Sequence, residues 1–314
     1  MRIGIDLGGT NIAAAAVENG GAITRRVSIP ANAEGGAKAV TGGLAAVCEN
    51  LLGGSSEPPL SIGIGVPGAV NSETGEVITT PNLPLSGVNI AHELQEKYNC
   101  PVYLGNDANC AALGEAIAGG AKGARNVIFI TLGTGIGGGI IIGGRLYTGL
   151  GGAAGEIGHM VVIAGGRECG CGRRGCWESY ASATGLARTA SEIMRAHKDG
   201  ALWKSCGGLP ENVDGRAVFD AFRAGDKAAR LAVEKYVEHL AIGIINLVNV
   251  FEPDMVCVGG GIANAWDCIA EPLREKIDSE KYTRFSKGTP QTEIVKAVLG
   301  NDAGIIGAAA LGAF

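Results

Sequence analysis

The chain opens with short apolar segments separated by a glycine turn. Residues 2–5 are apolar, residues 12–17 are rich in alanine and β-branched side chains, and Asp6-Leu7-Gly8-Gly9-Thr10 lies between them. Apolar runs of this length that are bounded by glycines are typical of β-strands. We therefore expect a strand, a glycine turn and a second strand at the start of the chain.

The same plan recurs near the middle of the chain. Residues 127–132 are apolar, the glycine-rich segment 133–139 follows as a turn, and residues 140–142 are apolar again. The two halves of the chain therefore resemble weak internal duplicates of one pattern, in which a glycine turn joins two strands.

Strand and helix patterns alternate over the rest of the chain, and this alternation predicts an α/β fold. Apolar residues recur at helical spacing from Val233 to Val248, and the strand pattern after them runs into Gly259-Gly260-Gly261. The remaining segments are strands at 62–66, 102–104 and 254–258, and helices at 90–98 and 108–118.

The length of 314 residues permits two domains with a cleft between them. We place the boundary near Asn106, which gives a small α/β domain at 1–106 and a larger α/β domain at 107–302. The stretch 303–314, which is rich in small residues, is expected to form a helix that packs back onto the first domain and joins it.

Composition excludes two classes of partner. The formal net charge is −5 and no run of lysine and arginine offsets it, which disfavours binding to nucleic acid. No apolar stretch approaches the roughly 20 residues that a membrane span requires. No apolar secretory leader follows Met1, so we expect a cytoplasmic protein in a reducing compartment.

A glycine-rich segment concentrates metal-ligand side chains. One imidazole and three thiolates suit a closed structural Zn²⁺ site. The alternatives are a disulfide or cysteines that fill the core, but the total of nine cysteines is odd and a reducing compartment is expected. Because Glu156 and Glu178 flank the segment, a bound metal would also fix two carboxylates near each other. The four expected ligands are His159, Cys169, Cys171 and Cys176.

The middle glycine turn matches a dinucleotide fingerprint only superficially. Residues 133–138 fit G-x-G-x-x-G, but that motif must open a helix, whereas residues 140–142 predict a strand. No P-loop pattern occurs. Bare amides and the Thr134 hydroxyl could instead cradle phosphate oxygens, and the first turn with Thr10 could do the same. The alternative is that both turns are simply tight hairpins.

These motifs together resemble the sugar kinases of the ROK (repressor, open reading frame, kinase) family over nearly the entire chain. The resemblance implies an actin- and hexokinase-like fold of two duplicated ribonuclease H-like domains that close on ATP and a sugar. It implies that Asp6 helps to hold Mg²⁺. It further implies contacts with the ATP phosphates from Gly8, Gly9, Thr10, Gly133, Thr134 and Gly135, and with the adenosine from Gly259, Gly260 and Gly261.

One position departs from the family pattern. The residue after Thr10 is often lysine in the family and is Asn11 in this chain. The departure puts a phosphate-contacting cation at that place in doubt, but amides and Mg²⁺ can neutralise phosphate charge without it.

Asp107 is the candidate catalytic base. Phosphoryl transfer to a hydroxyl needs a carboxylate that accepts the hydroxyl proton, and Asp107 stands between a predicted strand and a predicted helix. Its alternative role is a helix cap. The Asn-Asp pair of the family at this place favours the base, and it makes Asn106 a partner for a sugar hydroxyl.

A selective sugar pocket needs several acceptors that converge on one ring. Glu156, His159 and Glu178 offer them, and His159 could bind zinc through one ring nitrogen while its other N–H faces a hydroxyl. Asn82, in a Pro-Asn-Leu-Pro segment that resembles the family near the sugar, is a further candidate contact.

The sequence thus predicts an ATP-dependent hexose kinase, with phosphorylation of glucose at the 6-hydroxyl as the leading activity and a homodimer implied by the resemblance. N-acetylglucosamine, N-acetylmannosamine, fructose and allose remain alternative substrates. A sugar-sensing protein and a dehydrogenase are further alternatives. The first lacks room for a helix-turn-helix ahead of the strand at residue 2, and the second conflicts with the strand after the glycine turn.

Overall fold

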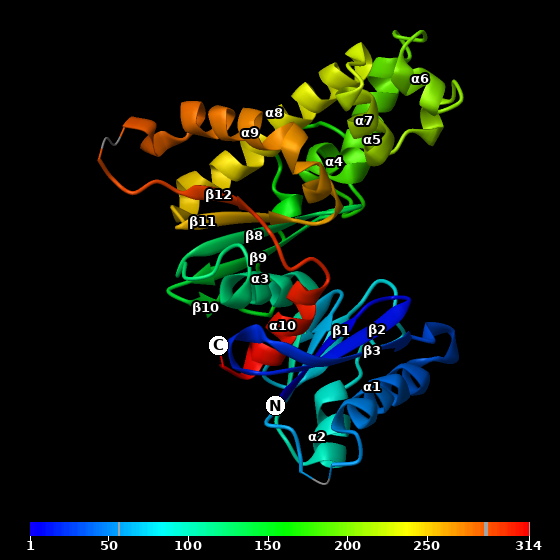
Figure 1. The fold of residues 1–314 in the computed structure, drawn as a ribbon, viewed down its shortest axis with the longest axis vertical. Helices are drawn as coiled ribbons and strands as arrows, with labels where there is room; N and C mark the ends of the chain where they lie inside the picture. Colours follow the sequence, from blue (N-terminus) through cyan, green and yellow to red (C-terminus); the bar gives the residue numbers. More distant parts are fainter. Residues whose placement is uncertain (56, 286–287, 314) are drawn as a thin grey trace. The chain divides into compact units, whose positions relative to one another are not determined.

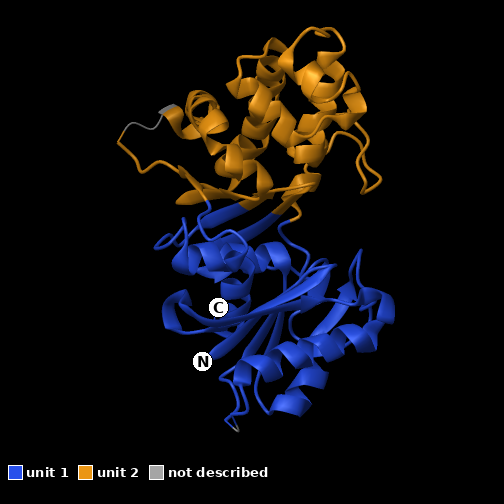
Figure 2. Cartoon of the chain, turned by 45° about the vertical axis from the view of Figure 1, so that its right-hand side comes forward, with its two compact units in different colours: residues 1–129, 138–155, 297–314 blue, residues 130–137, 156–296 orange. Residues whose placement is uncertain are grey.

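The computed structural model describes residues 1–55, 57–285 and 288–313. The chain forms two compact units, which Figure 2 colours separately. Unit 1 comprises residues 1–129, 138–155 and 297–314, and unit 2 comprises residues 130–137 and 156–296. The domain boundary predicted near Asn106 stays a prediction.

Unit 1 is built on a five-stranded sheet with the order β3-β2-β1-β4-β7. Strands β1, β4 and β7 are parallel to one another, and β2 pairs antiparallel with both β1 and β3. The strands predicted at 2–5, 12–17, 62–66 and 102–104 are confirmed. The strands are β1 (Arg2–Leu7), β2 (Asn11–Val17), β3 (Ile23–Pro30), β4 (Ile62–Val66) and β7 (Val102–Asn106), with a separate hairpin of β5 (Ala69–Asn71) and β6 (Glu76–Thr79).

Side chains of β1 alternate between the two faces of this sheet, as the period of two along a strand requires. Ile3, Ile5 and Leu7 lie in the main core cluster, to which α1 (Ala37–Leu52) and α2 (Ile90–Tyr98) also contribute. Gly4 and Asp6 lie on the other face, beside α10 (Asp302–Ala310). Asp6 is therefore half-buried on the face of the sheet that α10 covers.

Small residues allow α10 to lie directly on the sheet and on α3 (Asp107–Ala118). Figure 1 shows α10, in red, beside α3. A Cβ atom at Gly4 or at Gly63 would overlap backbone carbonyls of α10, and one at Gly307 would overlap the Cys110 carbonyl of α3. The small-residue composition of the C-terminal stretch thus has a packing cause.

The second sheet has the order β10-β9-β8-β11-β12. β8 and β9 each have residues in both units. β9 begins at residue 136, so the glycine turn is shorter than the predicted 133–139. A side chain at Gly139 would overlap Ala112, so this glycine serves close packing inside a strand. The strands are β8 (Val127–Leu132), β9 (Ile136–Ile142), β10 (Arg145–Leu146), β11 (Met255–Gly259) and β12 (Glu293–Lys296).

Unit 2 is largely helical around the long helix α8 (Lys227–Phe251). The fully buried Trp177 packs against Gly243 of α8 and donates its indole N–H to the His239 carbonyl at 2.8 Å. The other helices are α4 (Glu178–Ala181), α5 (Ala183–Met194), α6 (Ala201–Ser205), α7 (Gly215–Arg223) and α9 (Trp266–Glu280).

Short 3₁₀ helices complete the secondary structure. They are η1 (Asn19–Gly21), η2 (Ala33–Gly35), η3 (Ile157–His159), η4 (Pro210–Asn212), η5 (Gly261–Ala265), η6 (Tyr282–Phe285) and η7 (Leu311–Ala313). Among the described residues, no helix has the length and apolar character needed to cross a bilayer.

Candidate functional site

The predicted site residues of unit 1 gather where its parallel strands end. β1 leads into Gly8, Gly9 and Thr10, and β7 leads into Asn106 and Asp107. Because β1, β4 and β7 are parallel and adjacent, their carboxyl ends lie at one edge of the sheet, which is where α/β sheets bind ligands.

Asn106, not Asp107, caps helix α3. Its side-chain oxygen accepts the N–H groups of Ala108 at 2.9 Å and Asn109 at 3.1 Å, and its amide donates to the Gly68 carbonyl at 3.0 Å. The alternative role of Asp107 as the cap is therefore wrong. Both residue types suit a cap, and the chain assigns the task to the first of them. The Asn106 side chain also hydrogen-bonds to the Asp107 carboxyl.

Asp107 is the first residue of α3 and is exposed at the surface of unit 1. Its Oδ1 accepts the N–H of Ala108 at 2.8 Å. Neighbouring protein removes part of the hydration of the carboxyl and raises its pKa, and the Ala108 N–H opposes this rise. Asp107 is thus a carboxylate that solvent or a substrate can reach and that is more basic than an ordinary aspartate.

Asp6 lies close enough to Asp107 for the two charges to interact. Burial, followed by the charge of Asp107, raises the pKa of Asp6 from 3.8 to about 6. Two carboxylates whose mutual repulsion raises a pKa form a site that favours a cation, because a cation offsets both the repulsion and the loss of hydration. Asp6 and Asp107 could therefore hold a divalent metal.

The first glycine turn is closed by its own hairpin and by the residue that follows β3. The Gly8 N–H donates to the Asn11 carbonyl at 2.9 Å, and the Thr10 carbonyl accepts the Ala31 N–H at 2.8 Å. A Cβ atom at Gly9 would lie 3.4 Å from that of Asn82, so Asn82 flanks the turn. The Thr10 side chain is exposed.

The four predicted metal ligands come together in unit 2. Their ligand atoms all lie within 4.8 Å of one another. The Cys169 sulfur lies 3.6 Å from His159 Nδ1, and the Cys171 and Cys176 sulfurs are 3.6 Å apart. Zinc–sulfur bonds of about 2.3 Å in a tetrahedron place sulfurs about 3.8 Å apart. The four side chains therefore fit one tetrahedral metal ion.

The two flanking glutamates differ in their surroundings. Glu156 is exposed, with Oε2 3.9 Å from Nε2 of His159. Glu178 is half-buried, with Oε1 3.8 Å from the Cys169 sulfur. Its Oε2 accepts the backbone N–H of Ile136 at 2.8 Å. Sequence reasoning missed this second contact. It joins the middle glycine turn to the segment 159–176, which carries the four ligands and is called the metal-ligand loop below.

The glycine segments of unit 2 lie against each other. Gly260 has a φ of +83°, and a Cβ atom there would overlap the backbone of Leu132, the last residue of β8. The segment Gly259–Gly261 therefore approaches the start of the Gly133–Gly135 turn. Within that turn, the Gly133 N–H donates to the Gly135 carbonyl at 3.0 Å.

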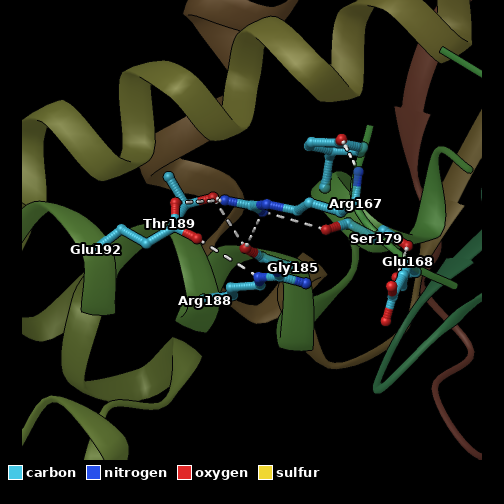
Figure 3. Close-up of polar contacts among 8 residues, drawn as sticks. Arg167, Glu168, Ser179, Gly185, Arg188, Thr189 and Glu192 are labelled. Atoms are coloured by element: carbon cyan, nitrogen blue, oxygen red, sulfur yellow. Dashed lines mark hydrogen bonds and ion pairs between the residues drawn. The ribbon is translucent and has the colours of Figure 1, made fainter. Parts of the chain in front are cut away.

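Arg167, which the sequence did not single out, braces the metal-ligand loop (Figure 3). Its guanidinium donates to the carbonyls of Ser179 at 3.2 Å and Gly185 at 3.4 Å and to the Thr189 hydroxyl at 3.1 Å, and it pairs with Glu192 at 2.8 Å. These bonds fix the residue two positions before Cys169 onto α4 and α5. No sequence signal marks an arginine of this kind, because two of its four partners are backbone carbonyls and all four are distant in sequence.

Comparison with known proteins agrees with these features. The ROK family model matches residues 2–313. The chain is 38% identical over 312 residues to a glucokinase of Halalkalibacterium halodurans, covering 97% of this chain and 92% of the relative. It is 32% identical to the xylose repressor of Bacillus subtilis over 248 residues, which cover 79% of this chain and 59% of the repressor.

A solved structure agrees as well. The ROK family glucokinase of Streptomyces griseus, in complex with glucose and AMPPNP, superposes with a TM-score of 0.77 at 33% identity, covering 99% of this chain and 98% of the other. The resemblance and the fold class predicted from the sequence are confirmed. The chain belongs to the ROK family and has the sugar-kinase fold of that family.

Proposed function

We propose that this chain is a glucokinase, which transfers the γ-phosphoryl group of ATP to the 6-hydroxyl of glucose. Similarity over nearly the full length to glucokinases supports the assignment. The structural observation that carries it is the position of Asp6 and of the exposed Asp107 at the carboxyl edge of the unit 1 sheet, where burial raises the pKa of both carboxyls.

Asp107 is the proposed general base. As the sugar oxygen attacks the γ-phosphorus, Asp107 accepts the hydroxyl proton, and ADP leaves with the electrons of the broken bond. The raised pKa favours this step, because a more basic carboxylate holds the transferred proton better. Asn106 fixes the start of α3 through its cap and so holds Asp107 in place.

The nucleotide is assigned to the glycine segments. The two glycine turns, with Gly8, Gly9, Gly133 and Gly135 and the hydroxyls of Thr10 and Thr134, are assigned to the phosphate oxygens. Gly259, Gly260 and Gly261 lie against the adenosine. Asp6 is the proposed ligand of Mg²⁺, directly or through water, and the bound cation neutralises phosphate charge.

The sugar is assigned to six polar side chains, as the resemblance to the family implies. They are Asn82, Asn106, Asp107, Glu156, His159 and Glu178. Carboxylates, amides and an imidazole each exchange hydrogen bonds with hydroxyls, which suits a hexose ring.

We assign a structural Zn²⁺ to the cysteine loop. His159, Cys169, Cys171 and Cys176 would hold it, and the bound ion would keep the loop in one conformation. With Nδ1 toward the sulfurs, His159 keeps Nε2 for Glu156 or for a sugar hydroxyl. Elemental analysis tests this assignment.

We propose a cytoplasmic homodimer, and the family resemblance motivates the dimer. Sedimentation that gives only the monomer mass at micromolar concentration would overturn it.

Phosphorylation of another hexose is the nearest alternative function. The similarity to a xylose repressor motivates a second alternative, a protein that senses a sugar without phosphorylating it. Mg-ATP-dependent ADP release should be measured with glucose, mannose, fructose, N-acetylglucosamine and N-acetylmannosamine. We expect strong preference for glucose. Preference for an N-acetylated sugar would change the assigned substrate and keep the kinase activity. Sugar binding without turnover would favour the sugar-sensing function.

A further inference from the structure

The segment 178–184, called the bridge segment below, holds the Gly133–Gly135 turn at three points. Glu178 Oε2 accepts the Ile136 N–H at 2.8 Å, the Ala183 N–H donates to the Gly133 carbonyl at 2.8 Å, and the Thr184 hydroxyl donates to the Thr134 carbonyl at 2.9 Å. The turn is thus fixed by residues 42 to 50 positions later in the chain.

These three bonds orient the turn. Two of them use the carbonyls of Gly133 and Thr134, and the third uses the N–H of Ile136 just after the turn. The N–H groups of Thr134 and Gly135 have no hydrogen-bond partner within residues 1–55, 57–285 and 288–313. The carbonyls of the turn are thus hydrogen-bonded, and its free N–H groups can donate to an anion.

The bridge segment is also fixed to the metal-ligand loop. The Trp177 N–H, one residue before the bridge segment, donates to the Met160 carbonyl at 2.7 Å. The Arg167 guanidinium, whose side chain is 14% exposed, donates to the Ser179 and Gly185 carbonyls (Figure 3). Glu178 touches the Cys169 sulfur and the turn with its two oxygens.

We propose that Thr184 and Glu178 are positioning residues for the nucleotide phosphates, and that the bridge segment transmits the order of the metal-ligand loop to the Gly133–Gly135 turn. The proposal rests on the proposed kinase function and extends it. Metal occupancy then sets affinity for ATP as well as the shape of the sugar pocket.

Thr184 is the cleaner of the two probes. Glu178 is assigned to the sugar, so its replacement would disturb two substrates. Among the residues that the structure describes, the exposed Thr184 makes one side-chain hydrogen bond, to Thr134. Thr184→Val removes the hydroxyl at nearly constant shape, and Thr184→Ser keeps it. Thr24→Val is a matched control, because Thr24 in unit 1 likewise donates to a backbone carbonyl, that of Ala16 at 3.3 Å.

Steady-state kinetics on metal-loaded protein test the proposal. Thr184→Val should raise the KM for ATP roughly three- to ten-fold, as expected for one hydrogen bond, with the KM for glucose and the metal content unchanged. Thr184→Ser and Thr24→Val should match the parent. An unchanged KM for ATP in Thr184→Val, or an equal rise in Thr184→Ser, would overturn it.

Amide hydrogen exchange gives a readout that needs no turnover. Exchange of the Gly133 and Ile136 amides should be faster in Thr184→Val than in the parent, and faster in the parent after metal removal, while the Gly8 amide stays unchanged. Equal exchange in all three proteins would overturn the proposal. If the parent phosphorylates no sugar, the kinase assignment fails, and the exchange data still decide whether the bridge segment orders the turn.

Discussion

The two glycine turns follow the same pattern in sequence and are held in different ways. The turn after β1 is closed by its own hairpin, through the Gly8 N–H and the Asn11 carbonyl. The turn after β8 depends on Glu178, Ala183 and Thr184, which belong to a segment beyond the cysteine loop. A duplicated motif can therefore keep its local geometry and differ in what stabilises it. Glu178 links the second turn to the metal-ligand loop.

The largest expected effect is on the chemistry that both turns serve. Asp107→Asn keeps the size of the side chain and removes its basicity, so kcat should fall about 10²- to 10⁴-fold. Calorimetry should still detect glucose binding, because the cap of α3 belongs to Asn106. Undiminished turnover would remove Asp107 from the role of base. Loss of glucose binding would instead show that Asp107 contributes to holding the sugar.

The second largest effect is expected from loss of the metal from the loop that is linked to the second turn. Cys176→Ser removes a fully buried ligand, so elemental analysis should fall from about one zinc per chain to near zero. The melting temperature should fall too, because the loop loses its cross-link. Cys206→Ser replaces another buried cysteine of unit 2, outside the ligand set, and should keep the zinc. Equal zinc in both variants would refute the assigned ligand set.

The pH dependence should report on the first turn and its neighbour Asp6. The folded-state pKa of Asp6 is raised to about 6, so its proton stabilises the fold fully below about pH 4, and this contribution is lost as pH rises through about 6. Mg-ATP competes with that proton. Its affinity, measured by calorimetry, should be about ten-fold weaker at pH 5 than at pH 7. Asp6→Asn should flatten this dependence, and a dependence that survives in Asp6→Asn would belong to another group.

The smallest effect is expected on the KM for ATP, when one glycine in each turn is replaced by alanine. A methyl at Gly135 would overlap the Glu178 carboxylate, whereas one at Gly8 would lie 3.2 Å from the Asn11 carbonyl. Gly135→Ala should raise the KM for ATP about five- to ten-fold through the lost Glu178 bond. Gly8→Ala should change it by at most about two-fold. The reverse order of the two effects would show that the first turn is the more constrained.

Local patterns predicted most of the elements of this fold. The first two strands, β8 and helix α2 follow from apolar runs bounded by glycines and from helical spacing. The cysteine cluster could also be predicted, because its ligands are close in sequence and few alternatives suit that composition. The extent of the middle turn was wrong, since Gly139 needs its glycine for packing against Ala112, a contact distant in sequence.

The links between site segments could not be predicted. Arg167 and Thr184 are ordinary polar residues whose partners are mostly backbone carbonyls more than ten positions away. The sequence also could not show that Asn106 caps α3 and leaves Asp107 free to act as the base, because both residue types cap helices. The choice depends on the residue at which the strand ends.

The central claim is phosphoryl transfer from ATP to a hexose hydroxyl, and product identification tests it most directly. The protein should be incubated with Mg-ATP and glucose and the products followed by phosphorus NMR. The account predicts ADP and glucose 6-phosphate in equal amounts, with neither formed when glucose is omitted. ADP and inorganic phosphate without a sugar phosphate, or no consumption of ATP, would contradict it.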